Sequence, residues 1–224
     1  MMTDKLRTAL VTGVATALTA GVFAVPAGAD AGTAGGPSHQ SAKHRLGTTS
    51  LATVLAADGH GFDRNWGDFD ILDHAVRRVL KKKPDSPVAL LAKGRERATV
   101  FAPTDRAFRK LVRALTGKAP MREKATFHAL TSAAGIDTIE SVLLYHVVPG
   151  RTLTSAKVVK SDGARLTTAQ GGVVVVNVTK NGVRLIDRDP DARNAKAIGR
   201  LLDINKGNRQ IAHGINRVLR PIDL

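Results

Sequence analysis

The 224-residue sequence contains no cysteine, and this absence excludes several classes of protein. Without thiols there is no disulfide framework, no thiolate metal site, no catalytic thiol and no lipid-modified N-terminal cysteine. Aromatic residues make up only 4% of the chain, with one Trp, one Tyr and six Phe. A surface that stacks nucleic-acid bases needs aromatic rings among its positive charges, so the scarcity argues against specific nucleic-acid binding.

Sequence motifs of the common enzyme classes are missing as well. There is no G-x-S-x-G, no H-E-x-x-H and no P-loop, and no spacing of Ser, His and Asp selects a catalytic triad. The acidic residues of Asp187–Asp191 begin like a calcium loop but lack its Gly and its Glu, so we interpret them as a solvated acidic turn. The sequence therefore predicts no catalytic residue, no cofactor and no metal ligand. An enzyme of unrecognised type or a lipid-pocket protein is the weakest of the functional hypotheses considered for this chain.

Positive charge is what the chain has in excess. It holds 34 Lys and Arg against 19 Asp and Glu, for a formal net charge of +15. Residues 73–124 alone hold 15 Lys and Arg against 5 Asp and Glu, so most of the excess lies in this region. Such a concentration of charge attracts polyanions.

The N-terminus has the parts of an export signal. Lys5 and Arg7 precede an uncharged, largely apolar run that ends in small residues at Ala29, and this pattern predicts a signal peptide over residues 1–29. The alternative is an uncleaved membrane anchor. No later segment is long and apolar enough to cross a bilayer, so we expect no membrane span after cleavage. Residues 30–49, rich in Gly, Ala, Ser and Thr, are expected to form a flexible linker, and residues 50–224 one domain.

Periodicity indicates an α+β domain. Apolar residues recur on one helical face between Asp70 and Lys83. Further helices are expected from Thr104 to Gly117, from about Arg122 to Ala134, and from Asp137, where Glu140 completes a capping box. Strands are expected over residues 99–102, 165–168, 173–179, 183–187 and 211–219, the third and fourth joined through Asn181-Gly182 as a hairpin. Helices early and strands late favour helices packed on antiparallel sheets.

Three segments in this order resemble the fasciclin (FAS1) family: Thr99–Phe108 with its Pro-Thr-Asp turn, Leu143–Gly150 with a Tyr-His pair, and Ile211–Pro221. The resemblance covers about residues 51–221. It implies a FAS1-like fold, an antiparallel β-sheet wedge or sandwich with helices packed on it. The chain departs from the family pattern at Arg209-Gln210, where the family has an Asn-Gly turn, and at Asn216, where it has Asp.

The resemblance also implies a function. It suggests a secreted or cell-surface module without enzymatic activity, which acts in adhesion and binds an extracellular or cell-envelope protein or polysaccharide. In animal members the Tyr-His motif is implicated in adhesion, so Tyr145 and His146 are candidate partner-binding residues. The alternative is that His146 is buried and hydrogen-bonded internally. The composition, rich in Ala, Arg, Gly and Val, suggests a bacterial source.

A second hypothesis rests on charge alone. The basic tract over residues 77–97 could bind extracellular polyanions such as anionic cell-wall polymers or polysaccharides. Candidate contacts lie opposite the apolar face of the first helix or at its end: Arg77, Arg78, Lys81, Lys82 and Lys83. The alternative is an ordinary solvated helix face.

Overall fold

The structure is a computed structural model that describes residues 45–57 and 59–222. The predicted signal peptide and residues 30–44 of the predicted linker lie outside the described residues. All described residues belong to one unit, which spans His44–Leu224.

Two separate sheets form the β structure. In the first, β1 (Ala98–Pro103) lies between β2 (Val147–Pro149), to which it is antiparallel, and β7 (Gln210–Ile215), to which it is parallel. The second sheet is antiparallel throughout, in the order β3-β4-β5-β6. Its strands are β3 (Arg165–Thr167), β4 (Val173–Thr179), β5 (Gly182–Ile186) and β6 (Ala195–Lys196).

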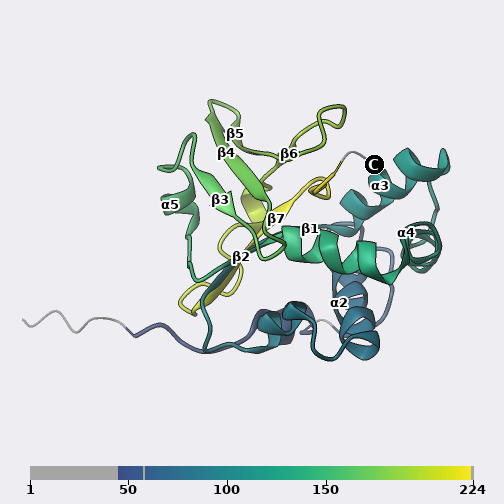
Figure 1. Cartoon of the computed structure of the whole chain (residues 1–224), viewed down its shortest axis with the longest axis horizontal. Coiled ribbons are helices and arrows are strands. Elements are labelled where there is room, and N and C mark those ends of the chain that lie inside the picture. Colours follow the sequence, from purple (N-terminus) through teal and green to yellow (C-terminus); the bar gives the residue numbers. More distant parts are fainter. Residues whose placement is uncertain (1–44, 58, 223–224) are drawn as a thin grey trace, which may run out of the picture. The chain divides into compact units, whose positions relative to one another are not determined.

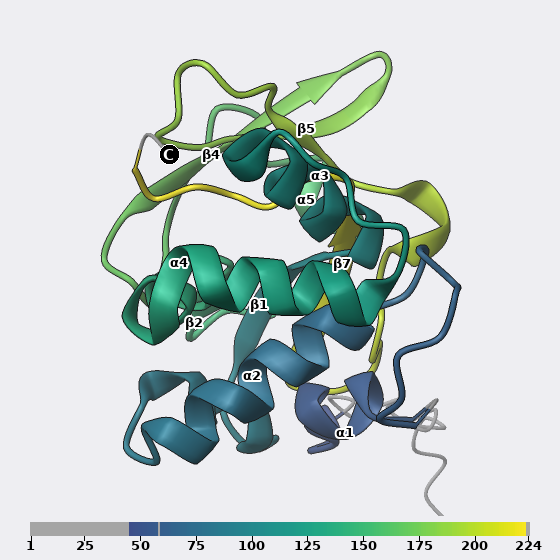
Figure 2. The same ribbon diagram turned by 90° about the vertical axis from the view of Figure 1, so that its right-hand side faces the viewer.

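Three long helices lie together beside the first sheet (Figures 1 and 2). They are α2 (Asp70–Lys82), α3 (Asp105–Thr116) and α4 (Glu123–Tyr145). Shorter elements are α1 (Leu51–Leu55), α5 (Ser155–Val158) and two 3₁₀ helices, η1 (Pro87–Ala92) and η2 (Gly199–Leu201). Gly117, with φ 71°, ends α3 in the left-handed conformation that favours glycine.

The α4 segment contains the two helices expected from the sequence. A non-helical Gly135, with φ 69° and ψ 171°, kinks the chain between them. The expected capping box is replaced by a tertiary contact. Lys83 donates to Asp137 at 2.8 Å and also to Glu140, and this contact joins the end of α2 to α4.

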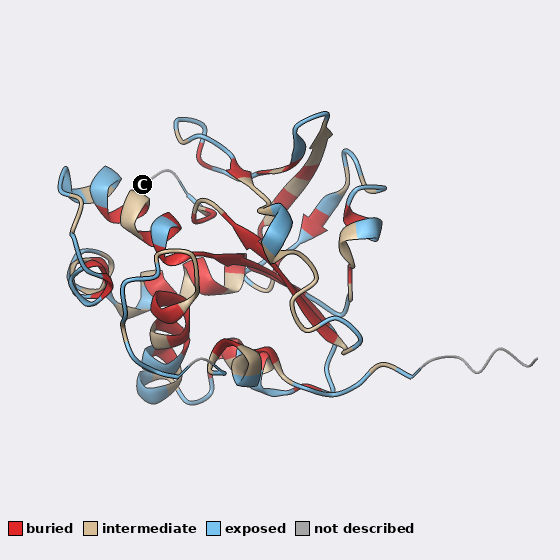
Figure 3. Ribbon diagram, turned by 180° about the vertical axis from the view of Figure 1, so that it is seen from behind, coloured by how far each residue is buried: buried red, intermediate tan, exposed pale blue. Residues whose placement is uncertain are grey.

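Strand β1 is buried along its whole length and packs on both faces. Its alternate residues Ala98, Val100 and Ala102 belong to the hydrophobic cluster beneath the helices. Phe101 belongs to a second cluster, formed mainly with the antiparallel sheet. Figure 3 shows this continuous burial along the central strands. Because side chains of a strand alternate between faces, β1 separates two cores.

The α+β class predicted from the sequence is confirmed, with two differences. The β1–β7 pair is parallel, which makes the first sheet mixed. The packed part of the chain also begins before residue 50. Gly47 donates its N–H to the Gly207 carbonyl at 2.8 Å, and Thr49 N–H donates to Asn208 Oδ1 at 3.0 Å.

The packing of this N-terminal segment can be tested at Gly94. A Cβ added there would overlap the backbone carbonyl of Thr48, which cannot move without disturbing these hydrogen bonds. We expect Gly94→Ala to lower the free energy of unfolding by about 1–3 kcal/mol in urea denaturation. Gly199→Ala is the matched control, because a Cβ there meets no atom within 4 Å. Equal stability of the two variants would contradict this packing.

Candidate functional site

Tyr145 and His146 lie where α4 ends, and both side chains are inside the protein. Their exposed fractions are 0% and 2%. The Tyr145 hydroxyl donates to the Val173 carbonyl at 2.8 Å, and burial raises the pKa of this phenol. The ring packs so closely against Gly172 that a Cβ at that position would lie 2.7 Å from Tyr145 Cε2. A partner cannot reach either candidate residue in this structure.

The two nitrogens of His146 are both used internally. Nδ1 lies 2.7 Å from the Val142 carbonyl and donates to it, while Nε2 accepts the Leu219 N–H at 2.8 Å. One donor and one acceptor require the neutral imidazole. Burial disfavours the charged form and lowers the pKa of His146 to about 4. His146 therefore has the internal role that the sequence analysis gave as the alternative.

Polar residues of the C-terminal motif are likewise engaged within the protein. His213 donates from Nε2 to the Leu153 carbonyl at 2.7 Å, and burial lowers its pKa. Asn216 accepts the Lys196 N–H through Oδ1 at 2.8 Å. An amide oxygen thus supplies the acceptor without a negative charge.

The acidic turn expected to be solvated is in fact partly buried, so that interpretation is wrong. The side chain of Asp189 is fully buried and accepts from Arg220 Nη1 at 2.7 Å. Its other oxygen accepts the N–H groups of Asp191 and Ala192 at 3.1 and 2.9 Å. Asp187 accepts the Arg220 N–H at 2.9 Å. The turn therefore anchors the C-terminal segment.

The predicted basic face of α2 is present with one exception. Arg77, Arg78, Lys81 and Lys82 are exposed. Arg77 lies 3.6 Å from Asp73 one helical turn earlier. Lys83 is half-buried and paired with acidic residues of α4, so it contributes to packing and not to the exposed face.

A second basic feature, which the sequence analysis missed, is a groove of about 480 Å³. We call it the cationic groove; its charged lining residues are Arg184, Arg193, Lys196 and Arg217. Asn194, Asn216 and Ala192 complete the lining, which includes no acidic residue. None of the four cations belongs to an ion pair found within the described part of the chain. Burial is the main cause that lowers the pKa of the nearby Lys110, and the positive charges of Arg217 in the groove and of Arg106 lower it further.

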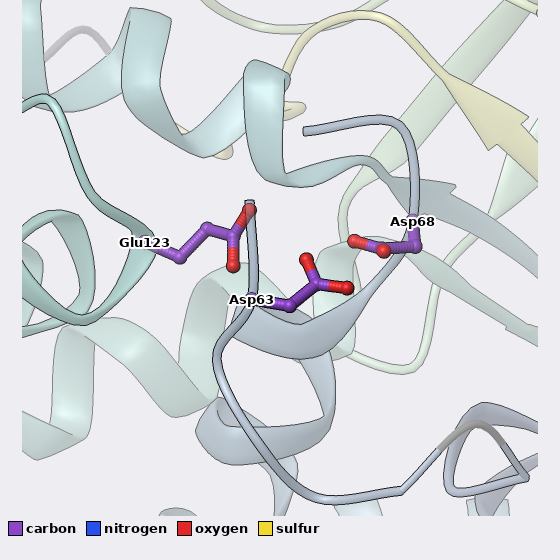
Figure 4. Close-up of side chains that lie close together, drawn as sticks. All are labelled: Asp63, Asp68 and Glu123. Carbon is purple, nitrogen blue, oxygen red and sulfur yellow. The ribbon is translucent and has the colours of Figure 1, made fainter. Parts of the chain in front are cut away.

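An acidic cluster was also missed. We define it as Asp63, Asp68, Asp70, Asp105 and Glu123. One carboxylate oxygen each from Asp63, Asp68 and Glu123 lie within 4.8 Å of one another, and the same holds for Asp68, Asp70 and Asp105. In Figure 4 the first three carboxylates converge on a common space. The sequence signal was that Asp70, Asp105 and Glu123 each begin a long helix.

Burial makes this cluster electrostatically costly. Burial is the main cause that raises the pKa of Asp105 to about 9, followed by its hydrogen bond with Asp68. The Ile71 N–H, 2.9 Å from Asp105 Oδ1, acts in the opposite direction but does not cancel these effects. Burial and then the charges of Asp63 and Asp68 raise the pKa of Glu123 to about 7.

An apolar cavity of about 180 Å³ lies among α2, α3 and α4. Its lining includes Phe108, Leu130 and Ile139. Ligand pockets usually measure about 300–1,000 Å³, so this space is small for a lipid. No helix in residues 45–57 or 59–222 combines the length and the apolar character needed to cross a membrane.

The role of His146 predicts a pH dependence of stability. In the unfolded chain this histidine has its ordinary pKa of 6.5, whereas in the folded protein the value is about 4. Below pH 6.5 the unfolded state binds the extra proton, so stability contributed by His146 is present above pH 6.5 and is lost as the pH falls toward 4. We expect the loss to reach roughly 3 kcal/mol.

Other buried groups titrate in the same range, so the measurement is a difference. Urea denaturation between pH 7.5 and 4 is compared for the wild type, His146→Gln and His128→Gln, the last of which changes an exposed histidine. His146→Gln should be less stable at pH 7.5 and show a smaller loss toward pH 4. Parallel pH curves for wild type and His146→Gln would refute the assignment.

Comparison with known proteins agrees with the motifs. Among solved structures, the chain is similar to a FAS1 domain pair from the insect cell adhesion molecule fasciclin I, with 19% sequence identity and a TM-score of 0.47. The match covers 68% of this chain and 48% of that chain, so this chain spans about half the length of the matched structure. No curated protein matches the sequence. The model of the Fasciclin domain matches residues 76–221, which is more than half of the chain, and the protein therefore belongs to the Fasciclin domain family.

Proposed function

We propose that this chain is a non-enzymatic FAS1 binding module that works outside the cell, in adhesion or in contacts with extracellular matrix or the cell envelope. The observation that carries the proposal is the Fasciclin domain match over residues 76–221. The predicted signal peptide over residues 1–29 supports the extracellular location. A fold hosts many functions, so the binding itself needs direct measurement.

The partner surface lies away from the Tyr-His motif under this proposal. Tyr145 and His146 are buried and hydrogen-bonded to backbone groups, so their substitution would damage the fold before it tested binding. Cations are more accessible to a partner, both on the exposed α2 face and in the cationic groove, where Arg193 is exposed and the other three cations are partly buried.

A second candidate function is the binding of extracellular polyanions. The observation that favours it is the cationic groove, which gathers four cations with no acidic residue in its lining. Arg184 contributes a buried Nε that has no hydrogen-bond partner. Guanidinium groups bind phosphate and carboxylate oxygens in bidentate geometry, so anionic cell-wall polymers and polysaccharides are the ligand class that fits. The exposed α2 face would add a less specific attraction.

Cell binding tests the first proposal. Labelled full chain is titrated onto the producing cells, their isolated envelopes and matrix preparations, with unlabelled chain as competitor. We expect saturable, competable binding that persists at about 0.5 M NaCl, where exposed charge interactions are largely screened. Absence of saturable binding to all three preparations would refute the adhesion proposal.

Two double variants that remove the same charge test the second candidate. Arg193→Gln with Arg217→Gln changes the cationic groove, and Arg77→Gln with Arg78→Gln changes the α2 face. Retention on a sulfated polysaccharide matrix is measured by salt elution. We expect the groove variant to elute at clearly lower salt than the α2 variant. Equal shifts would show attraction by net charge and would contradict a site in the groove.

A further inference from the structure

The acidic cluster holds five carboxylates in a chain whose net charge is +15. Asp70, Asp105 and Glu123 are buried, and the last two are fully so. Asp68 belongs to both groups of close oxygens and links them into one assembly. Because isolated charges are expensive to bury, a folded protein must neutralise such an assembly.

Glu123 is the member of the cluster that points most directly to a bound cation. Its side chain is fully buried, and neither carboxylate oxygen has a hydrogen-bond partner of normal geometry. The Asp63 N–H lowers the pKa of Glu123, but by less than burial and the charges of Asp63 and Asp68 raise it. The carboxylate points into the space shared with Asp63 and Asp68 (Figure 4).

The protein supplies part of the required positive charge through its helices. The cluster lies at the starts of α2, α3 and α4. Each helix N-terminus acts as about half an elementary charge, so three such ends offset about half of the charge of Asp63, Asp105 and Glu123. Within the described residues, Asp63, Asp105 and Glu123 belong to no ion pair with Lys, Arg or His. Bound protons or a bound cation can supply the remainder.

We propose that the acidic cluster is a calcium site, in which Asp63, Asp68 and Glu123 bind the ion and Asp70 and Asp105 border it. All available donors are carboxylate oxygens, which suit a hard divalent cation. Ca²⁺ accepts six to eight oxygens in flexible geometry, whereas Mg²⁺ demands a near-ideal octahedron and gives up its water reluctantly. Asp63 is exposed, so the ion has a route to the buried oxygens.

Part of the proposed site lies outside the segment that matches the Fasciclin domain. Asp63, Asp68 and Asp70 precede the Fasciclin match, which starts at residue 76. The loop that carries Asp63 is already held against α2, where Phe62 stacks on His74 with ring centroids 3.9 Å apart. Bound Ca²⁺ would add a second attachment, between this loop and the start of α4.

The experiment uses the full chain after treatment with a chelator. CaCl₂ is titrated by isothermal calorimetry, and thermal unfolding is followed with CaCl₂ or with NaCl at equal ionic strength. The variants are Asp63→Asn and Glu123→Gln. Asp63→Asn keeps an oxygen that can accept the Asn65 N–H, which lies 2.5 Å from Asp63 Oδ1. Asp85→Asn is the control, since Asp85 is exposed and outside the cluster.

We expect saturable Ca²⁺ binding by the wild type and by Asp85→Asn, with a rise in melting temperature that NaCl does not reproduce. Asp63→Asn should bind at least about tenfold more weakly, because it removes one charged ligand. Glu123→Gln separates binding from folding. Without Ca²⁺ it should melt at or above the wild-type temperature, since it removes a buried charge, and with Ca²⁺ it should gain little.

Two results would overturn the proposal. One is a wild type that, at about 10 mM CaCl₂, shows no heat of binding and no rise in melting temperature beyond that caused by NaCl. This concentration exceeds the dissociation constants of even the weakest extracellular calcium modules. The other is equal Ca²⁺ affinity of Asp63→Asn and Asp85→Asn. Either result would exclude a calcium site built on Asp63, Asp68 and Glu123, and neither would affect the adhesion proposal.

Discussion

The neutral imidazole of His146 joins three parts of the domain that are distant in sequence. The ring donates to the Val142 carbonyl in α4 and accepts the Leu219 N–H of the C-terminal segment. The backbone carbonyl of His146 accepts the Phe101 N–H of β1 at 3.0 Å. A protonated ring has two donors and no acceptor, so the contact to Leu219 exists only in the neutral form. The neighbouring Tyr145 packs in the hydrophobic core formed with the antiparallel sheet. The Tyr-His motif therefore connects the two cores, and neither of its side chains is exposed to a partner in this structure.

Local elements of this fold could be predicted from sequence because their causes are local. The apolar stripe of α2 and the β4–β5 hairpin, where Gly182 has φ 102°, follow from periodicity and turn chemistry. The parallel pairing of β1 with β7 could not be predicted in this way. Their partners, such as Ala98 and Gln210, are far apart in sequence, and hydrophobic patterning gives the type of an element without its neighbour.

The functional surfaces show the same division. Helical periodicity correctly places Arg77, Arg78, Lys81 and Lys82 on an exposed face, but only the tertiary structure shows that Lys83 turns toward α4. Acidic residues at helix starts are ordinary in sequence because they suit the helix dipole. Only the tertiary structure shows that three helix starts meet, so that each carboxylate raises the free energy needed to ionise the others.

Burial separates the two opposite charge distributions of this domain. The acidic cluster lies at the starts of α2, α3 and α4, whereas the cationic groove is built from β5, β6 and segments that follow β5 and β7. Exposed charges are screened over about 8–10 Å at physiological ionic strength, but buried carboxylates are screened much less. A cation bound in the cluster would therefore act chiefly on the packing of the three helices and the loop that carries Asp63. Anion binding at the groove would instead depend on charges that solvent reaches, so it would weaken as the salt concentration rises. The proposed cation site and the proposed anion site can therefore be tested independently of each other in one FAS1 domain.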